Sequence, residues 1–256
     1  MGRSTDNNQN VLERRKVLRV LGGALAASVV VSCGGSGASG SSTGTSSTSS
    51  SNSSCTVTPE GEEGPYFVDD SASGFNRSDI RSNLDGTNTQ DGIPLTLSVY
   101  VLDTKNSCAA LSGVQVDIWH CNALGVYSAE NVEDTTGETW LRGYQVTDSN
   151  GLVKFTTIFP GWYEGRTTHI HLRVRSSYDS LSAGGTDTTQ LFFPQATIDT
   201  IYASVSPYSS RGANSTTNAT DHVYSSEVNG ETLLTLSGGT SGYSARFNIG
   251  VPITSA

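Results

Sequence analysis

Residues 161–174 read Gly-Trp-Tyr-Glu-Gly-Arg-Thr-Thr-His-Ile-His-Leu-Arg-Val, and the end of this stretch decides the fold. On a β-strand, side chains two residues apart point to the same face. His169 and His171 therefore project together, while Ile170 and Leu172 point to the opposite, apolar face. Two imidazoles on one face of a rigid strand form half of a metal site. Structural or surface histidines give the same pattern, so the pair needs further donors beside it.

Similar alternating runs recur along the chain, and Gly, Asn and Pro turn signals separate them. In residues 95–102, Leu95, Leu97, Val99 and Val101 share one face. The other runs cover residues 114–119, 152–158, 169–174, 189–193, 232–236 and 245–249. Such runs are typical of an antiparallel β-sandwich, so the predicted fold class is all-β, with long loops at the site. We expect one short helix, over residues 196–203.

The charge of the chain argues against nucleic acid as a partner. The net charge is −9, although residues 1–54 hold five basic and only two acidic side chains. The acidic excess therefore lies in the remainder of the chain. An acidic domain repels phosphate backbones, so we expect no nucleic-acid binding.

The first 33 residues have the features of an export signal. The apolar run from Val20 to Val31 is shorter than the roughly 18–20 residues that span a bilayer, and it is typical of a signal-peptide core. Arg14 and Arg15 precede it, which favours a twin-arginine signal over an ordinary basic region. Cys33 follows at a position that resembles a lipoprotein cleavage site. We expect an exported protein, periplasmic or extracellular, with a lipid anchor at Cys33.

Residues 34–54 consist only of Gly, Ser, Ala, Thr and Asn. Such a segment cannot bury enough apolar surface to become ordered, so we expect a flexible linker. The predicted organisation is a signal peptide (1–33), a linker (34–54) and one domain (55–256).

Three cysteines remain in the predicted domain if Cys33 carries a lipid. Export permits disulfides. Cys108 comes just before one predicted strand and Cys121 just after it, so we expect a Cys108–Cys121 bridge with Cys55 left over. Because no close CxxC pair exists, a cysteine-rich metal site is not expected.

Three stretches surround the two histidines in the sequence. Residues 58–67 contain Thr-Pro-Glu and Glu-Gly-Pro-Tyr-Phe, and residues 116–128 read Val-Asp-Ile-Trp-His-Cys-Asn-Ala-Leu-Gly-Val-Tyr-Ser. Residues 141–171 run from Leu-Arg-Gly-Tyr-Gln-Val-Thr-Asp to the two histidines. In this order, over most of residues 57–193, they resemble the intradiol ring-cleavage dioxygenases. The resemblance is closest to the protocatechuate 3,4-dioxygenase type of core.

This resemblance implies one non-haem Fe(III) and an oxidative ring cleavage. The implied ligands are Tyr127, Tyr163, His169 and His171. A catechol and O₂ would be the substrates, and the ring would open between its two hydroxylated carbons to give a muconate-type diacid. The resemblance also implies that Tyr163 leaves the iron when catechol binds and that Tyr127 stays.

Four further site residues follow from the same resemblance. Arg166 matches a family arginine that stabilises negative charge on the substrate ring, and Gln190 matches a glutamine near the substrate. Tyr66 and Trp162 are expected to wall the pocket, since aromatic walls suit a flat aromatic ligand. For these two aromatic residues, a role in the core is the alternative.

The chain departs from the family pattern in one informative place. Only Glu164 and Gly165 stand between Tyr163 and Arg166, where many family members have a longer connection. A lower wall and a more open iron are therefore expected, which favours bulky lignin-derived or plant-phenolic catechols. Two other hypotheses stay open: a catalytically inactive tethered binding module, and another metal, such as copper, at the same ligands. A homo-oligomer also stays open.

Overall fold

The computed structural model describes residues 55–68, 74–175 and 186–252. The predicted signal peptide with Cys33, and the predicted linker, lie outside the described residues. All described residues fall within one compact unit, Ser51–Ala256. None of the helices in this described part is both long and apolar enough to cross a bilayer.

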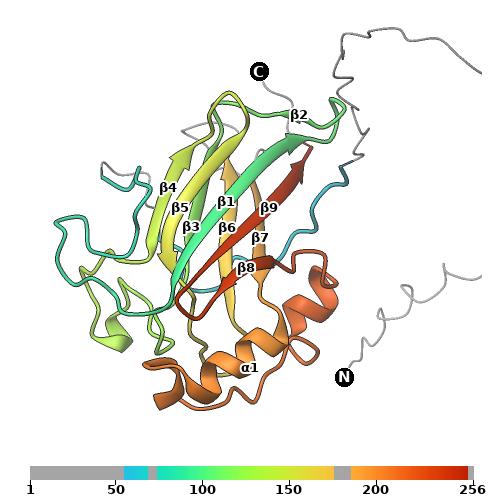
Figure 1. Ribbon diagram of the computed structural model, residues 1–256. Helices are drawn as coiled ribbons and strands as arrows, with labels where there is room; N and C mark the ends of the chain where they lie inside the picture. The colour runs from blue at the N-terminus through green and yellow to red at the C-terminus, as the bar shows by residue number, and fades with distance from the viewer. Residues whose placement is uncertain (1–54, 69–73, 176–185, 253–256) are drawn as a thin grey trace, which may run out of the picture. The chain divides into compact units, whose positions relative to one another are not determined.

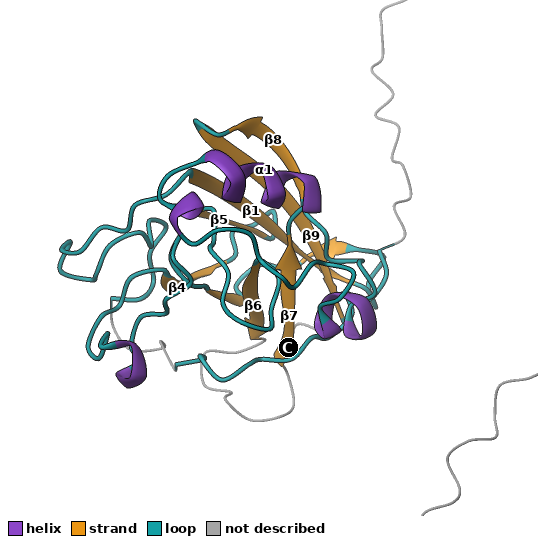
Figure 2. Ribbon diagram, turned by 90° about the horizontal axis from the view of Figure 1, so that it is seen from below, coloured by secondary structure: helices purple, strands orange, loops and turns teal. Residues whose placement is uncertain are grey.

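Two β-sheets form the framework of the domain (Figure 1). In the first sheet, β1 (Pro94–Asp103) pairs with β5 (Leu152–Ile158) and β9 (Gly242–Val251), β8 (Thr235–Gly239) pairs with β9, and the short β2 (Ala109–Ala110) joins the end of β1. The second sheet has the order β4 (Arg142–Val146), β3 (Gln115–Trp119), β6 (His169–Arg175) and β7 (Thr186–Phe192). In Figure 2, turned by 90°, β1, β5 and β8 of the first sheet lie above β4, β6 and β7 of the second.

Helical segments lie in the connections between the strands. The helix α1 (Gln195–Ser204) crosses the lower end of the strands in Figure 1 and buries Ile198, Ile201 and Tyr202. This confirms the short helix predicted over residues 196–203. The remaining helical turns are η1 (Asn131–Glu133), η2 (Tyr208–Ser210) and η3 (Val223–Glu227).

The core lies between the sheets and follows the predicted alternation. The β1 side chains Leu95, Leu97, Val99 and Val101 are all at most 1% exposed. They belong to the same apolar cluster as the inward-facing residues of β3 and β6. Burying each such side chain contributes about 1.5–3 kcal/mol, so this alternation fixes which face of every strand turns inward.

The all-β class is confirmed, but the prediction of a purely antiparallel sandwich is wrong. β1 and β9 run parallel, with Leu95 opposite Tyr243 and Asp103 opposite Val251. The first sheet is therefore mixed. A period-two pattern states which face of a strand is buried and carries no information on strand direction.

Residues 55–67, which we call the leading segment, cover the outer face of the second sheet. The amide of Gly61 donates to the carbonyl of Thr188 on β7 at 3.0 Å. Glu63 pairs with Arg173 on β6 at 2.6 Å, and the Phe67 ring lies 5.0 Å from that of Trp119 on β3. β6 is consequently buried on both faces along its whole length.

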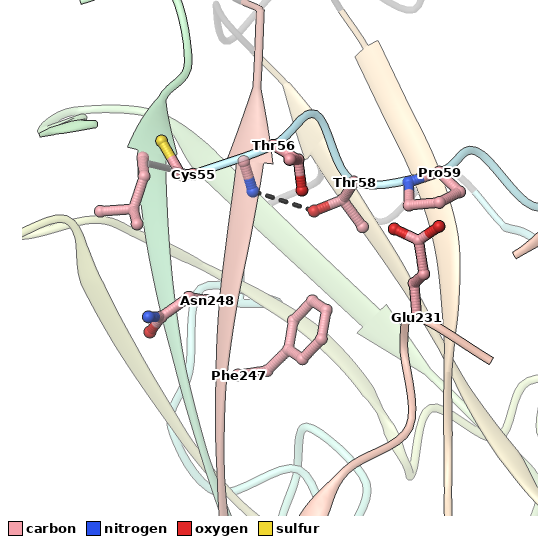
Figure 3. A pocket seen from close by; sticks show the side chains of 9 residues that line it. Cys55, Thr56, Thr58, Pro59, Glu231, Phe247 and Asn248 are labelled. Carbon is pink, nitrogen blue, oxygen red and sulfur yellow. Dashed lines mark hydrogen bonds between the residues drawn. The ribbon is translucent and has the colours of Figure 1, made fainter. Parts of the chain in front are cut away.

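A pocket of about 230 Å³ lies where the leading segment crosses β9 (Figure 3). The amide of Gly250 donates to Thr58 Oγ1 at 2.9 Å, and Phe247 and Glu231 line the pocket below and opposite Thr58. None of the residues that line it is among the predicted site residues. The pocket is therefore separate from the candidate centre described below.

The predicted Cys108–Cys121 bridge is wrong. Cys55 forms the disulfide with Cys108, and Cys121 is a buried free cysteine. Cys121 packs in a small cluster with Trp119 and Tyr127, and burial raises the pKa of its thiol to about 12. The bridge therefore fixes the start of the leading segment to the first sheet's edge instead of joining the two ends of a strand.

This disulfide gives a direct test of the fold. It closes a loop with a sequence separation of 53 residues. We expect Cys55→Ser and Cys108→Ser each to lower the free energy of unfolding by about 4 kcal/mol in urea titrations, with no further loss in the double variant. In the oxidised wild type, Cys121 should react with a thiol reagent only after unfolding. A cross-linked peptide that joins Cys108 to Cys121 would contradict this assignment.

Candidate metal centre

Two loops bring the predicted tyrosines together. Tyr127 lies in the loop that follows β3, and Tyr163 lies in the loop that follows β5. Gly161 donates its amide to the Asn122 carbonyl at 3.0 Å, and a Cβ at Gly161 would lie 2.4 Å from that oxygen. A Cβ at Gly125, where φ is +84°, would lie 2.0 Å from the Trp162 carbonyl oxygen. Only glycine fits at these two positions, so the loops pack backbone against backbone.

Three donor atoms converge beside β6. Nε2 of His169 lies 3.1 Å from Nε2 of His171, and Oη of Tyr163 lies 3.4 Å from Nε2 of His169. Two ligand atoms that are each about 2.1 Å from the same ion, with a right angle between the two metal–ligand bonds, lie about 3 Å from each other. Both separations are therefore close to those of neighbouring ligands of one metal ion.

Tyr127 lies beside these three residues. Its ring centroid is 5.6 Å from that of Tyr163 and 6.3 Å from that of His171. Its hydroxyl is buried and has no hydrogen-bond partner among the described residues. A buried polar atom without a partner is costly, and a metal ion is one group that satisfies a phenol oxygen.

The surroundings hold both imidazoles in place. The Thr167 carbonyl accepts a hydrogen bond from Nδ1 of His169 at 2.6 Å, which leaves the lone pair on Nε2 for the centre. The His171 ring stacks on Trp119 with centroids 4.8 Å apart and planes 6° apart. Gly64 lies against the edge of the His171 ring, so that a Cβ added at Gly64 would be 3.1 Å from Cε1 of His171.

Burial controls the charge of all four side chains. It lowers the pKa of His169 to about 3 and that of His171 well below its ordinary value. It raises the pKa of Tyr163, and raises that of Tyr127 well above 10. At neutral pH the protein alone thus holds two neutral imidazoles and two neutral phenols. Neutral imidazoles bind metals directly, whereas the phenols need a strongly charged cation to ionise.

The backbone of Tyr127 is tied down by its own loop. Its amide donates to the Glu133 carboxylate at 2.8 Å, and its carbonyl accepts from Thr135 Oγ1 at 2.7 Å.

The Tyr66 ring stacks on the Tyr127 ring, with centroids 4.2 Å apart, and meets the edge of the Tyr163 ring at 5.5 Å. Tyr66 therefore lines the centre. Trp162 instead lies under the Arg211 guanidinium, 4.4 Å from its ring centroid, and its Nε1 donates to the Gly212 carbonyl.

Arg166 and Gln190 lie together behind the centre. The Arg166 guanidinium donates to Asp221 Oδ2 at 2.8 Å, to Glu62 Oε1 at 3.3 Å and to Gln190 Oε1. Gln190 Nε2 donates to the Glu62 carbonyl at 2.8 Å, which fixes the orientation of its amide. The sequence predicted Arg166 and Gln190 for this region and missed Asp221 and Glu62.

Comparisons with known proteins identify the family and similar folds. A family model described as "Dioxygenase" matches residues 62–206. The solved structure of an intradiol ring-cleavage dioxygenase from Tetranychus urticae is similar with a TM-score of 0.66 and 27% identity, over 79% of this chain and 98% of that chain.

Two curated relatives are catechol 1,2-dioxygenases. The protein from Candida albicans is 30% identical over 131 residues, which are 43% of this chain and 40% of that protein. The protein from Pseudomonas sp. is 33% identical over 122 residues, which are 46% of this chain and 37% of that protein. The matches therefore span well under half the length of these relatives.

The contact between Gly64 and His171 can be tested with a matched pair of variants. Gly64 has a φ of +73°, and Gly86 has a φ of +83° with nothing within 4 Å of its added Cβ. We expect Gly64→Ala and Gly86→Ala to lower the free energy of unfolding similarly, by roughly 1–2 kcal/mol, because both force a left-handed residue. Only Gly64→Ala should also lower the bound metal per chain, since its methyl group displaces the imidazole. Equal metal content in the two variants, measured by elemental analysis, would exclude this role.

Proposed function

The chain belongs to the intradiol ring-cleavage dioxygenase family, and from that premise we propose that it opens the ring of a catechol between the two hydroxylated carbons with O₂. The product would be a muconate-type diacid that contains both oxygen atoms. We propose one non-haem Fe(III) per chain as the cofactor. Its proposed ligands are Tyr127, Tyr163, His169 and His171.

One observation supports this proposal above the others. Nε2 of His169 lies 3.1 Å from Nε2 of His171 and 3.4 Å from the Tyr163 hydroxyl, and Tyr127, whose buried hydroxyl has no partner among the described residues, packs in one cluster with Tyr163. Phenolate oxygen is a hard anionic donor, and a trivalent cation beside it favours the ionised form. Two phenolates and two neutral imidazoles thus suit ferric iron better than a softer divalent metal. When bound, ferric iron would withdraw electrons from a chelated catecholate and make its ring reactive towards O₂.

The side chains around the centre have separable roles in this proposal. Tyr163 would be one of the residues that hold the iron, and its phenolate oxygen would take up a proton from the incoming catechol. The positive charge of Arg166 works against burial by lowering the pKa of the Tyr163 phenol, which favours the phenolate that would bind the metal. Tyr66 presents its ring beside both tyrosines and can stack on a flat substrate. Gln190 orients the Arg166 guanidinium from the other side.

We also propose where the enzyme works and on what. Export through a twin-arginine signal would place the domain in the periplasm or outside the cell, with Cys33 as the lipid anchor. The short Glu164–Gly165 connection supports bulky lignin-derived or plant-phenolic catechols as substrates, since both residues are exposed. Arg166 and the surrounding loops would still bind simple catechol.

The anchor is tested by cell fractionation. We expect the wild type in the membrane fraction and the Cys33→Ala variant in the soluble exported fraction, because a chain without acyl groups has no membrane affinity. Recovery of wild type and variant in the same fraction would rule out lipidation at Cys33.

The iron site is tested by the visible spectrum of the purified, iron-loaded protein. We expect a charge-transfer band from tyrosinate to Fe(III), and we expect this band to shift when catechol is added without oxygen. Tyr163→Phe should weaken the band and lower catechol turnover by more than about 100-fold, because loss of a ligand exceeds the usual effect of its outer partners.

Tyr100→Phe provides the control for this substitution. Tyr100 lies on β1 beneath the Arg246 guanidinium, away from the four proposed ligands. Its variant should keep the band and the turnover of the wild type. A wild-type protein that stays colourless after iron loading would support an inactive binding module, and full turnover by Tyr163→Phe would refute the ligand assignment.

A further inference from the structure

Asp221 is a fully buried carboxylate that lies just before η3, outside the residues matched by the family model. Its Oδ1 accepts from the amides of Val223 and Tyr224, both at 3.0 Å. Its Oδ2 accepts from Nε of Arg166 and from the amide of Thr167, both at 2.8 Å, and Nη2 of Arg166 also donates to Oδ1 at the longer distance of 3.4 Å. One carboxylate thus joins the η3 turn to the loop that leads into β6.

The contact with Arg166 sets the direction of the guanidinium. Of the three side chains that accept hydrogen bonds from Arg166, Gln190 is neutral and the Glu62 side chain is 42% exposed. The Asp221 side chain is 0% exposed, so its charge is the least screened by water. A charge-assisted hydrogen bond in a buried setting is both shorter and more directional than a neutral one.

The contact with Thr167 reaches the proposed iron ligand His169. The Thr167 amide donates to Asp221, and the Thr167 carbonyl accepts from Nδ1 of His169 at 2.6 Å. The two hydrogen bonds lie on either side of the Thr167 Cα and together restrain the backbone of this residue. The same Oδ2 atom therefore holds the guanidinium and the amide of the residue whose carbonyl orients the imidazole.

We propose that Asp221 is a positioning residue that couples the orientation of Arg166 to that of His169, and this inference rests on the proposed function. Asp221 acts through these two residues and touches neither the proposed iron ligand atoms nor a substrate. Without its charge, the guanidinium is free to turn towards Glu62 at the surface, and the Thr167 peptide loses its anchor.

The Asp221→Asn variant tests the inference because an amide has only one oxygen. It can accept from Arg166 and Thr167, or from Val223 and Tyr224, but not from both pairs. We expect kcat for catechol to fall by about 10–100-fold with a smaller change in KM, as for other outer partners of metal ligands. In the Arg166→Gln background, the same substitution should have a clearly smaller effect on kcat, because the two residues act together.

A second readout needs no turnover. The Thr167 amide should exchange with deuterium at least about tenfold faster in metal-free Asp221→Asn than in the metal-free wild type, because its acceptor is weakened. Asp221→Glu retains the charge but moves it by one methylene group. This variant should fold and still lose kcat, so a folding defect of Asp221→Asn leaves the inference testable.

Asp117→Asn is the matched control. Asp117 forms a buried pair with Arg175 at 2.8 Å on the same sheet and contacts neither Arg166 nor Thr167 in any hydrogen bond of the described residues. It should destabilise the fold with less than about a threefold change in kcat. Equal kcat losses at Asp221 and Asp117, or unchanged exchange at Thr167, would overturn the inference. An inactive wild type would instead refute the proposed function itself.

Discussion

The candidate centre depends on the burial of β6 on both faces. One face packs into the apolar core, and the other carries His169, His171, Arg173 and Arg175 under the leading segment. In water, each imidazole would titrate near pH 6.5 and protons would compete with a metal. Burial removes that competition but places two arginines inside the protein. Glu63 and Asp117 pair with them, so the polar face stays closed without an unpaired charge.

The leading segment that closes this face is itself held at several points. The Cys55–Cys108 disulfide fixes its start, the Thr58 amide binds the Gly250 carbonyl, and the Gly61 amide binds Thr188. Beyond these points the segment brings Gly64 against His171 and the Tyr66 ring against Tyr127. A segment with so few apolar residues could not stay on the sheet by hydrophobic burial alone. The covalent and hydrogen-bonded attachments therefore maintain the environment in which the imidazoles stay neutral.

The sequence predicted the parts of the fold that periodicity determines. The alternation in β1, β3 and β6 identified the inward residues, whereas β4 was missed because Arg142, Gly143 and Tyr144 are all buried and show no alternation. The strand expected over residues 232–236 lies instead at Thr235–Gly239. Strand direction, as in β9, and the pairing of Cys55 depend on how distant segments meet. A local sequence pattern carries no information on contacts between distant segments.

The same limit applies to the candidate centre. The strand pattern predicts His169 and His171, and the family resemblance predicts the two tyrosines. Neither the pattern nor the resemblance points to Asp221 or Glu62. They reach Arg166 across 55 and 104 residues of sequence.

The two tyrosines also differ in a way that only the structure reveals. Tyr127 is 1% exposed, stacked on Tyr66 and fixed through its backbone, whereas Tyr163 is partly exposed and has Arg166 beside its hydroxyl. A ligand that leaves the metal needs room to move, and a ligand that stays does not. This asymmetry supports the proposal that Tyr163 leaves the metal and Tyr127 remains.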